Sequence, residues 1–205
     1  MEISAEKTMP MTNNINGINT EIKVNRQKLE TVTSYKHLGL AITDEGFTPE
    51  ILSRIAQKTA AMTRLKPIWN DKSISLSSKI RLMRSLVTFI FLYVCESWTL
   101  TAELQRRIQA MEIRCYRKIL RISNKDHVTY EEVHAKIQQA TGPREDLLTT
   151  IKRRKLQWYG HVSRSSGLTK TILQGTVKGG RRHGRQKKRW EDNIREWIGL
   201  EFGKS

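Results

Sequence analysis

Pairs of neighbouring acids are the first places to look for catalysis in this sequence, because carboxylates hold metal ions and transfer protons. Asp44 and Glu45 lie in a hydrophilic stretch that ends in Gly46, with no second acid pair nearby. That pattern is typical of a solvated turn. Glu191 and Asp192 open a predicted helix, where acids interact favourably with the helix dipole. We therefore expect no catalytic residue. A small metal-dependent nuclease that uses Glu191 and Asp192 is an alternative that the sequence leaves open.

The histidines and cysteines do not stand at the spacing of a metal site. None of the five histidines pairs with another histidine or a cysteine at zinc-finger spacing. Cys95 and Cys115 lie in apolar helical stretches, which predicts buried, reduced thiols in an intracellular protein. No Walker phosphate loop, GxSxG nucleophile elbow or HExxH zinc motif is present. We therefore expect no bound metal and no cofactor in this chain.

Dense clusters of Lys and Arg are the strongest chemical signal in the sequence. One cluster fills a single turn of a predicted helix, and the other alternates with glycines before the last predicted helix. Guanidinium groups bind phosphates bidentately, and glycine lets a backbone approach a polyanion closely. A nuclear-import signal has a similar composition and is compatible with nucleic-acid binding. The residues that we predict to contact nucleic acid are Lys152, Arg153, Arg154, Lys155, Lys178, Arg181, Arg182, Arg185, Lys187, Lys188 and Arg189.

The charge of the whole chain points to the same class of partner. The 205 residues carry a formal net charge of +17. Residues 1–100 hold 13 Lys and Arg against 9 Asp and Glu, whereas residues 101–205 hold 24 against 11. The second half is therefore the predicted contact surface for a polyanion such as RNA or DNA. The apolar run at 86–95 is too short to span a bilayer and no secretory signal opens the sequence, so we expect no membrane partner.

Aromatic residues accompany the cations. Trp158, Tyr159 and Trp190 lie near the two clusters in sequence and have the flat rings on which bases stack. Core packing is the competing interpretation of each tryptophan, and we favour it for Trp158 and Trp197. His161 is interpreted as a packed or capping imidazole.

A mainly α fold is predicted, with short β structure at the start. Alternation over 21–32 predicts a hairpin, and 34–43 is interpreted as a further strand. Apolar residues at helical spacing then predict a series of helices. In the first helix Lys58 lies off the predicted apolar stripe, and Pro67 ends that helix. Thr129 and Glu132 form a capping box. The predicted helices cover 49–66, 75–95 and 101–122, a short segment that Gly142-Pro143 ends, 144–163 and Trp190 to Trp197.

The inward side of the second helix is predicted from the same spacing. Its core positions are Leu76, Ile80, Met83, Val87, Ile90 and Val94.

Several stretches, in a fixed order, resemble the C-terminal part of non-LTR (LINE-type) retrotransposon reverse transcriptases. A YxxLG pattern by itself is weak, whereas LYVCESWTL followed by RRKLQWYGH and GRRHGRQKKRW is specific. The resemblance covers nearly the whole chain. The stretches are SAEKT, SYKHLGLAIT, LSSKIRLMRSLVTFIFLYVCESWTLT, MEIRCYRKILRIS, RRKLQWYGHVSR and GRRHGRQKKRWEDNI.

The resemblance implies a map of the chain. Residues 1–47 would be a palm remnant with a primer-grip-like strand, residues 48–123 a thumb-like helical bundle, and residues 124–205 a basic linker-like region with short helices. Lys7 lies where the family has a lysine that is proposed to protonate the pyrophosphate leaving group. The family more often has an aromatic residue at the position of His37. The primer-grip-like residues, which would hold the 3′ end of the primer, are Tyr35, Lys36, His37, Leu38 and Gly39.

The resemblance also implies what the chain lacks. The fingers, most of the palm, the metal-binding aspartates and the endonuclease domain of such proteins have no counterpart in this sequence. We therefore expect the chain not to extend a primer by itself, and Mg²⁺ to bind only in an intact parent polymerase.

The expected function is that of a nucleic-acid-binding fragment of an RNA-directed DNA polymerase, located in the nucleus or in both nucleus and cytoplasm. It would contact the template–primer backbone of RNA and DNA, and the missing polymerase core would be a partner if the open reading frame is longer. A domesticated helical adaptor or nucleic-acid-binding protein with no polymerase role is the alternative.

Overall fold

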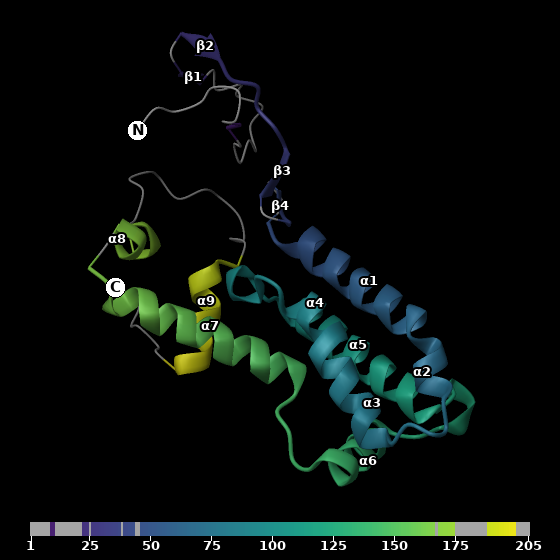
Figure 1. The fold of residues 1–205 in the computed structure, drawn as a ribbon. Coiled ribbons are helices and arrows are strands. Elements are labelled where there is room, and N and C mark those ends of the chain that lie inside the picture. Colours follow the sequence, from purple (N-terminus) through teal and green to yellow (C-terminus); the bar gives the residue numbers. More distant parts are fainter. Residues whose placement is uncertain are drawn as a thin grey trace. The chain divides into compact units, whose positions relative to one another are not determined.

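The structure is a computed structural model, and it describes residues 9–10, 22–24, 26–37, 39–43, 46–166, 168–174 and 188–199. Helices make up most of these residues, and two small two-stranded sheets lie in the N-terminal part of the chain (Figure 1). This confirms the predicted mainly α fold with short N-terminal strands. By the contacts between its residues the chain divides into two compact units, 1–53 and 54–205. The finer division at residues 47 and 123 stays a prediction.

Two β-hairpins contain the described strands of the first unit. β1 (Lys23–Val24) pairs antiparallel with β2 (Gln27–Lys28), as the alternation predicted. β3 (Ser34–His37) pairs antiparallel with β4 (Leu40–Thr43). The prediction of one continuous strand over 34–43 is therefore wrong. The chain reverses at Gly39, whose φ of 81° lies in the left-handed region that favours glycine.

A helix close to the predicted span 49–66 is present, and a short second helix follows it. α1 (Thr48–Arg64) ends before Pro67, and α2 (Lys66–Asn70) has Pro67 in its first turn. A proline there loses no helical hydrogen bond, so Pro67 lies at the start of a helix instead of ending one. Trp69 of α2 is buried, and its indole N–H donates to Met62 O at 2.8 Å. This bond holds α2 against the end of α1.

The predicted helix over 75–95 contains a π-helical turn. α3 (Leu76–Leu82) continues into the π-helix η2 (Met83–Thr88) and then into α4 (Phe89–Leu92). A π turn holds more residues than an α turn, so it shifts the phase of every side chain that follows. Phe91 is fully buried, whereas Ile90 is 37% exposed. The prediction that Ile90 faces the core is therefore wrong.

Capping residues define the next helices. The Thr101 hydroxyl accepts a hydrogen bond from Leu104 N at 3.3 Å and caps the helix that begins at Ala102. The predicted capping box is confirmed, because Glu132 N donates to Thr129 Oγ1 at 3.3 Å and Thr129 N donates to Glu132 Oε2 at 2.9 Å. The elements of this part are the 3₁₀ turn η3 (Cys95–Ser97), α5 (Ala102–Leu120), the 3₁₀ turn η4 (Asn124–Asp126) and α6 (Tyr130–Thr141).

Three helices complete the described chain. α7 (Leu147–Arg164) and α9 (Trp190–Ile198) match the two predicted last helices, and α8 (Leu168–Gln174) was not predicted. Asp146 caps α7, since its Oδ1 accepts from Thr149 N at 2.6 Å. Figure 1 shows α9, in yellow, against α7, in green. None of the helices in the described ranges combines the length and apolarity needed to cross a membrane.

The core of the second unit contains buried ionisable side chains, among them one from α1 and one from α5. Lys58 is 1% exposed and Glu112 is 4% exposed. Lys58 lies seven residues after Ile51 and four before Met62, so it is on the apolar face, and the prediction that it lies off that stripe is wrong. Burial lowers the pKa of Lys58, and the nearby Cys115 and Glu112 oppose that shift.

Glu112 fixes the start of α7. Its carboxylate accepts hydrogen bonds from Leu147 N at 3.0 and 3.2 Å and from Tyr116 Oη at 3.0 Å. Leu147 is the first residue of α7, whose first-turn N–H groups have no partner within the helix. The buried acid therefore ties α7 to α5 and sets where α7 begins. The buried apolar side chains of this unit include Ile80, Met83, Val87, Phe91, Trp98, Leu100, Leu104, Ile108, Met111, Ile119, Val133, Ile137, Leu148 and Ile151.

Candidate nucleic-acid interface

α7 carries cations and no acid along its whole length. Its 18 residues include five Lys and Arg side chains, and neither Asp nor Glu. Helical geometry distributes these five cations around the helix, so they meet different surroundings. Arg153 is exposed and pairs with Glu145 at 3.2 Å, and the half-buried Arg154 lies 3.8 Å from Glu96.

Lys155 occupies the inner side of α7 and is fully buried. Its Nζ donates to Trp98 O at 2.7 Å and to Asn193 Oδ1 at 3.1 Å. The ammonium lies 4.5 Å from the centre of the Trp190 ring and 5.4 Å from that of Trp197. Burial lowers the pKa of Lys155 to about 7, and Lys188 adds to the shift. With no exposed surface, Lys155 cannot reach a phosphate in this arrangement, and we leave it out of the interface proposed below.

The last helix is anchored by polar contacts with the segment that precedes α5. Asn193 is fully buried, accepts from Leu100 N at 2.7 Å and donates to Leu100 O at 2.8 Å. The indole N–H of Trp190 donates to Glu96 O at 2.8 Å. Together with Lys155, these bonds join α9 to both α7 and η3.

The anchoring of α9 places the end of the second cationic cluster beside α7. Lys188 and Arg189 directly precede α9, and Lys188 is close enough to Lys155 to depress its pKa. The N–H of Arg189 donates to Asp192 Oδ2 at 2.6 Å, so Asp192 acts as a helix cap. The chain thus brings together Lys155 and Lys188, which are more than thirty residues apart in sequence. The other predicted residues of this cluster, Lys178, Arg181, Arg182, Arg185 and Lys187, lie outside the described residues.

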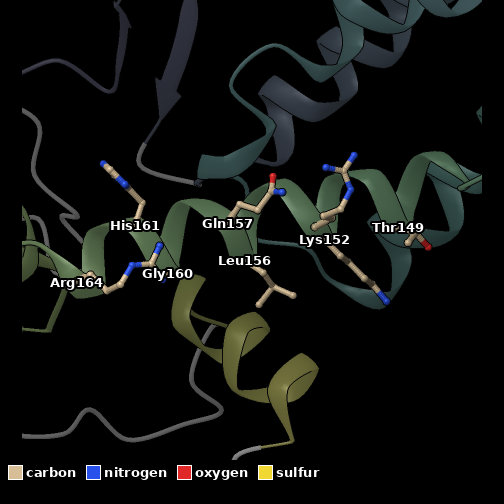
Figure 2. Close-up of a pocket in the computed structure, with 8 residues that line it drawn as sticks. Thr149, Lys152, Leu156, Gln157, Gly160, His161 and Arg164 are labelled. Atoms are coloured by element: carbon tan, nitrogen blue, oxygen red, sulfur yellow. The ribbon is translucent and has the colours of Figure 1, made fainter.

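A shallow trough follows the outer side of α7 (Figure 2). Its volume is about 670 Å³, and every lining residue belongs to α7. Figure 2 shows the side chains spread along one helix, with Thr149 and Lys152 near one end and His161 and Arg164 near the other. The lining residues are Thr149, Lys152, Arg153, Leu156, Gln157, Gly160, His161 and Arg164; none of them is acidic, and none is Phe, Tyr or Trp.

The sequence predicts the binding residues at only one end of this trough. It predicted Lys152 and Arg153 and missed Gln157, Gly160 and Arg164. His161 is exposed at the trough, so its interpretation as a packed imidazole is wrong. Helical spacing was the available signal, because positions three, four, seven, eight and eleven residues after 153 lie on the same side of α7 as Arg153.

The aromatic residues of α7 and α9 form one cluster. The rings of Trp158 and Trp190 meet edge to face at 5.3 Å, and the centres of Tyr159 and Trp190 are 6.3 Å apart. Trp158 is 39% exposed, so the prediction that it packs in the core is wrong. Trp197 is half-buried, and Lys152 Nζ lies 5.4 Å from its ring. The cluster therefore supports the docking of α9 and leaves part of Trp158 accessible.

The primer-grip-like residues lie in the β3–β4 hairpin of the first unit. Tyr35 is opposite Ile42, and Lys36 is opposite Ala41. His37 ends β3, and Gly39 forms the turn. Leu38 and Lys7 lie outside the described residues. Nothing in this hairpin tests a role in holding a primer, which stays a prediction.

Within the described ranges, no group of three or more His, Cys, Asp or Glu side chains is placed to hold a metal ion. Cys95 and Cys115 are free and buried, as predicted. Burial raises the pKa of the Cys95 thiol to about 12, which keeps it protonated at neutral pH.

Comparison with known proteins gives one informative relative. No family model matches the chain, and no solved structure matches it. An uncharacterized protein of Caenorhabditis elegans, named as transposon-derived, is 27% identical over 175 residues. The match covers 83% of this chain and 62% of the relative, so the chain spans less than two thirds of that protein's length. This similarity fits a transposon origin.

Proposed function

We propose that the chain is the nucleic-acid-holding C-terminal part of a non-LTR retrotransposon reverse transcriptase. The observation that carries this proposal is the anchoring of α9, which sets the end of the basic cluster next to the acid-free helix α7. Two cationic segments joined in this way form one extended surface for a polyanion. The transposon-derived relative supports an origin in a mobile element, and the ordered motifs support the reverse-transcriptase assignment.

The binding surface in this proposal combines the exposed cations of α7 with the basic cluster at 178–189. Arginine and lysine side chains bind phosphates without regard to base sequence, so the surface holds RNA or DNA by the backbone. If the surface neutralises six to ten phosphates, affinity falls by roughly 10³ to 10⁵ between 50 and 200 mM salt.

Polymerisation itself belongs to a catalytic core outside this chain. In the proposed parent enzyme, Mg²⁺ and its aspartate ligands lie in that core, and this chain binds the template–primer. The proposed location is the nucleus, or nucleus and cytoplasm, because the substrate of such an element is genomic DNA.

Two measurements on the purified full chain test the proposal. Fluorescence anisotropy with single-stranded and duplex RNA and DNA, over a salt series, should show binding that weakens steeply with salt. Incubation with a primed RNA template, Mg²⁺ and nucleotides should give no extension. Robust extension would contradict the proposal that polymerisation requires a catalytic core outside this chain. A chain that binds none of the four nucleic acids would favour the adaptor alternative.

A further inference from the structure

Gly160 is an unusual residue for its place in the fold. It lies in the interior of α7, four residues before the helix ends, and glycine is less favourable than alanine in a helix interior. Packing does not require a glycine there. Among the described residues, a Cβ atom added at Gly160 meets only Arg164 Nη1, at 3.4 Å, which is an ordinary contact with the end of a flexible side chain.

The surroundings of Gly160 are cationic and rich in hydrogen-bond donors. The residue lines the trough between Lys152 on one side and Arg164 on the other (Figure 2), and Arg153 also lines this trough. Gln157 and His161, which also line the trough, flank it on the same helix. The missing side chain therefore leaves a bare stretch of helix backbone in the middle of a positively charged trough.

We propose that Gly160 is the point of closest approach for a sugar–phosphate strand that lies along the trough. This inference rests on the proposed function and names where and how the strand is held. Lys152 and Arg164 are twelve residues apart, or about 18 Å along a helix, which covers several successive phosphates. Cations lie toward both ends of the trough and no Phe, Tyr or Trp lines it, so the inferred contact is to the backbone and not to the bases.

The proposal predicts that adding bulk at Gly160 weakens binding while it strengthens the helix. Gly160→Ala and Gly160→Leu both replace glycine by a better helix former, so both variants should unfold at a higher temperature than the natural chain. Gly160→Leu should bind a 12-nucleotide DNA strand roughly tenfold more weakly, because the added side chain holds the strand away from the flanking cations. Gly160→Ala should show a smaller loss. Loss of fold cannot explain a variant that is more stable and binds less.

The matched control is Ala135→Leu, which adds similar bulk at an exposed position of α6 and should leave binding unchanged. An abasic strand of the same length separates backbone from base contacts, and the ratio of natural chain to Gly160→Leu should be the same on both strands. Equal binding by Gly160→Leu and the natural chain overturns the inference and leaves the proposed function standing. A loss seen only on the strand with bases also overturns it. Absence of binding by the natural chain overturns the proposed function and this inference together.

Discussion

The inner and outer sides of α7 carry the same types of cation in different surroundings. On the inner side, Lys155 is fully buried, and its ammonium contacts a carbonyl, an amide oxygen and two indole rings. On the outer side, Arg153 and Arg164 line an open trough, and Lys152 lies between the two sides, because it also lines the trough while its Nζ is 5.4 Å from the Trp197 ring. Position around the helix therefore decides whether a cation joins elements of the fold or faces an external anion. The sides should respond to different perturbations: inner-side changes act on stability, and outer-side changes act on binding.

The largest expected effect is on the inner side. Asn193→Ala removes the partner of both backbone groups of Leu100 and one acceptor of Lys155. Buried backbone groups left unpaired should cost about 2–4 kcal/mol in the free energy of unfolding. Urea denaturation measures this loss. Gln139→Ala, at an exposed position of α6, is the control and should change stability by less than about 0.5 kcal/mol. A loss for Asn193→Ala no larger than that of the control would show that the α9 contacts contribute little.

A second inner-side effect is a dependence of stability on pH. The folded pKa of Lys155 is lowered to about 7, below its ordinary value. The unfolded chain therefore binds more protons than the folded chain between these two values, and stability rises with pH in that window. Below about pH 7 both states are protonated and the destabilising effect is complete.

The test compares the natural chain with Lys155→Met. The free energy of unfolding of the natural chain should gain roughly 2 kcal/mol relative to the variant between pH 7.5 and 9.5. Lys136→Met, at an exposed site on α6, should show no such difference. Parallel pH profiles for the natural chain and Lys155→Met would mean that the contacts of the ammonium offset its burial.

The smallest expected effect is on nucleic-acid binding, from the acid that pairs with Arg153 on the outer side. Glu145 pairs with Arg153 at 3.2 Å, and the hydrogen bond from Arg153 lowers the pKa of Glu145. This carboxylate competes with phosphate for the guanidinium. Glu145→Gln should therefore tighten binding to a DNA strand by roughly twofold, the scale of an exposed ion pair. Anisotropy titration measures the change, and weaker binding by the variant would argue that Glu145 positions Arg153 for its ligand.

The local features that the sequence predicts correctly are those set by neighbouring residues. The capping box at Thr129 and Glu132, the hairpin at 23–28 and the amphipathic α7 all depend on short-range spacing. Helical spacing after Arg153 also contains the information that Gln157, Gly160 and Arg164 share its side. The residues on this side of α7 could therefore have been predicted from the sequence.

Other features depend on contacts that periodicity does not report. The π turn at Met83–Thr88 changes the phase of the following helix, and the exposure of Ile90 follows from it. The sequence predicts Lys58 off the apolar stripe and Lys155 at the surface, yet both are buried, with an aromatic ring beside each ammonium group. The docking of Asn193 on Leu100 joins positions far apart in the chain, and no local pattern contains it.

The central claim is that the outer side of α7 holds nucleic-acid phosphates, and the salt dependence of binding tests it most directly. The variant to measure combines Lys152→Gln, Arg153→Gln and Arg164→Gln. Its control combines Lys125→Gln, Lys136→Gln and Arg144→Gln, which remove the same charge at exposed positions outside the trough. The slope of log affinity against log salt should become shallower by about 2 to 3 in the trough variant, with its stability unchanged, and should change little in the control. Equal slopes for the two variants would contradict the account.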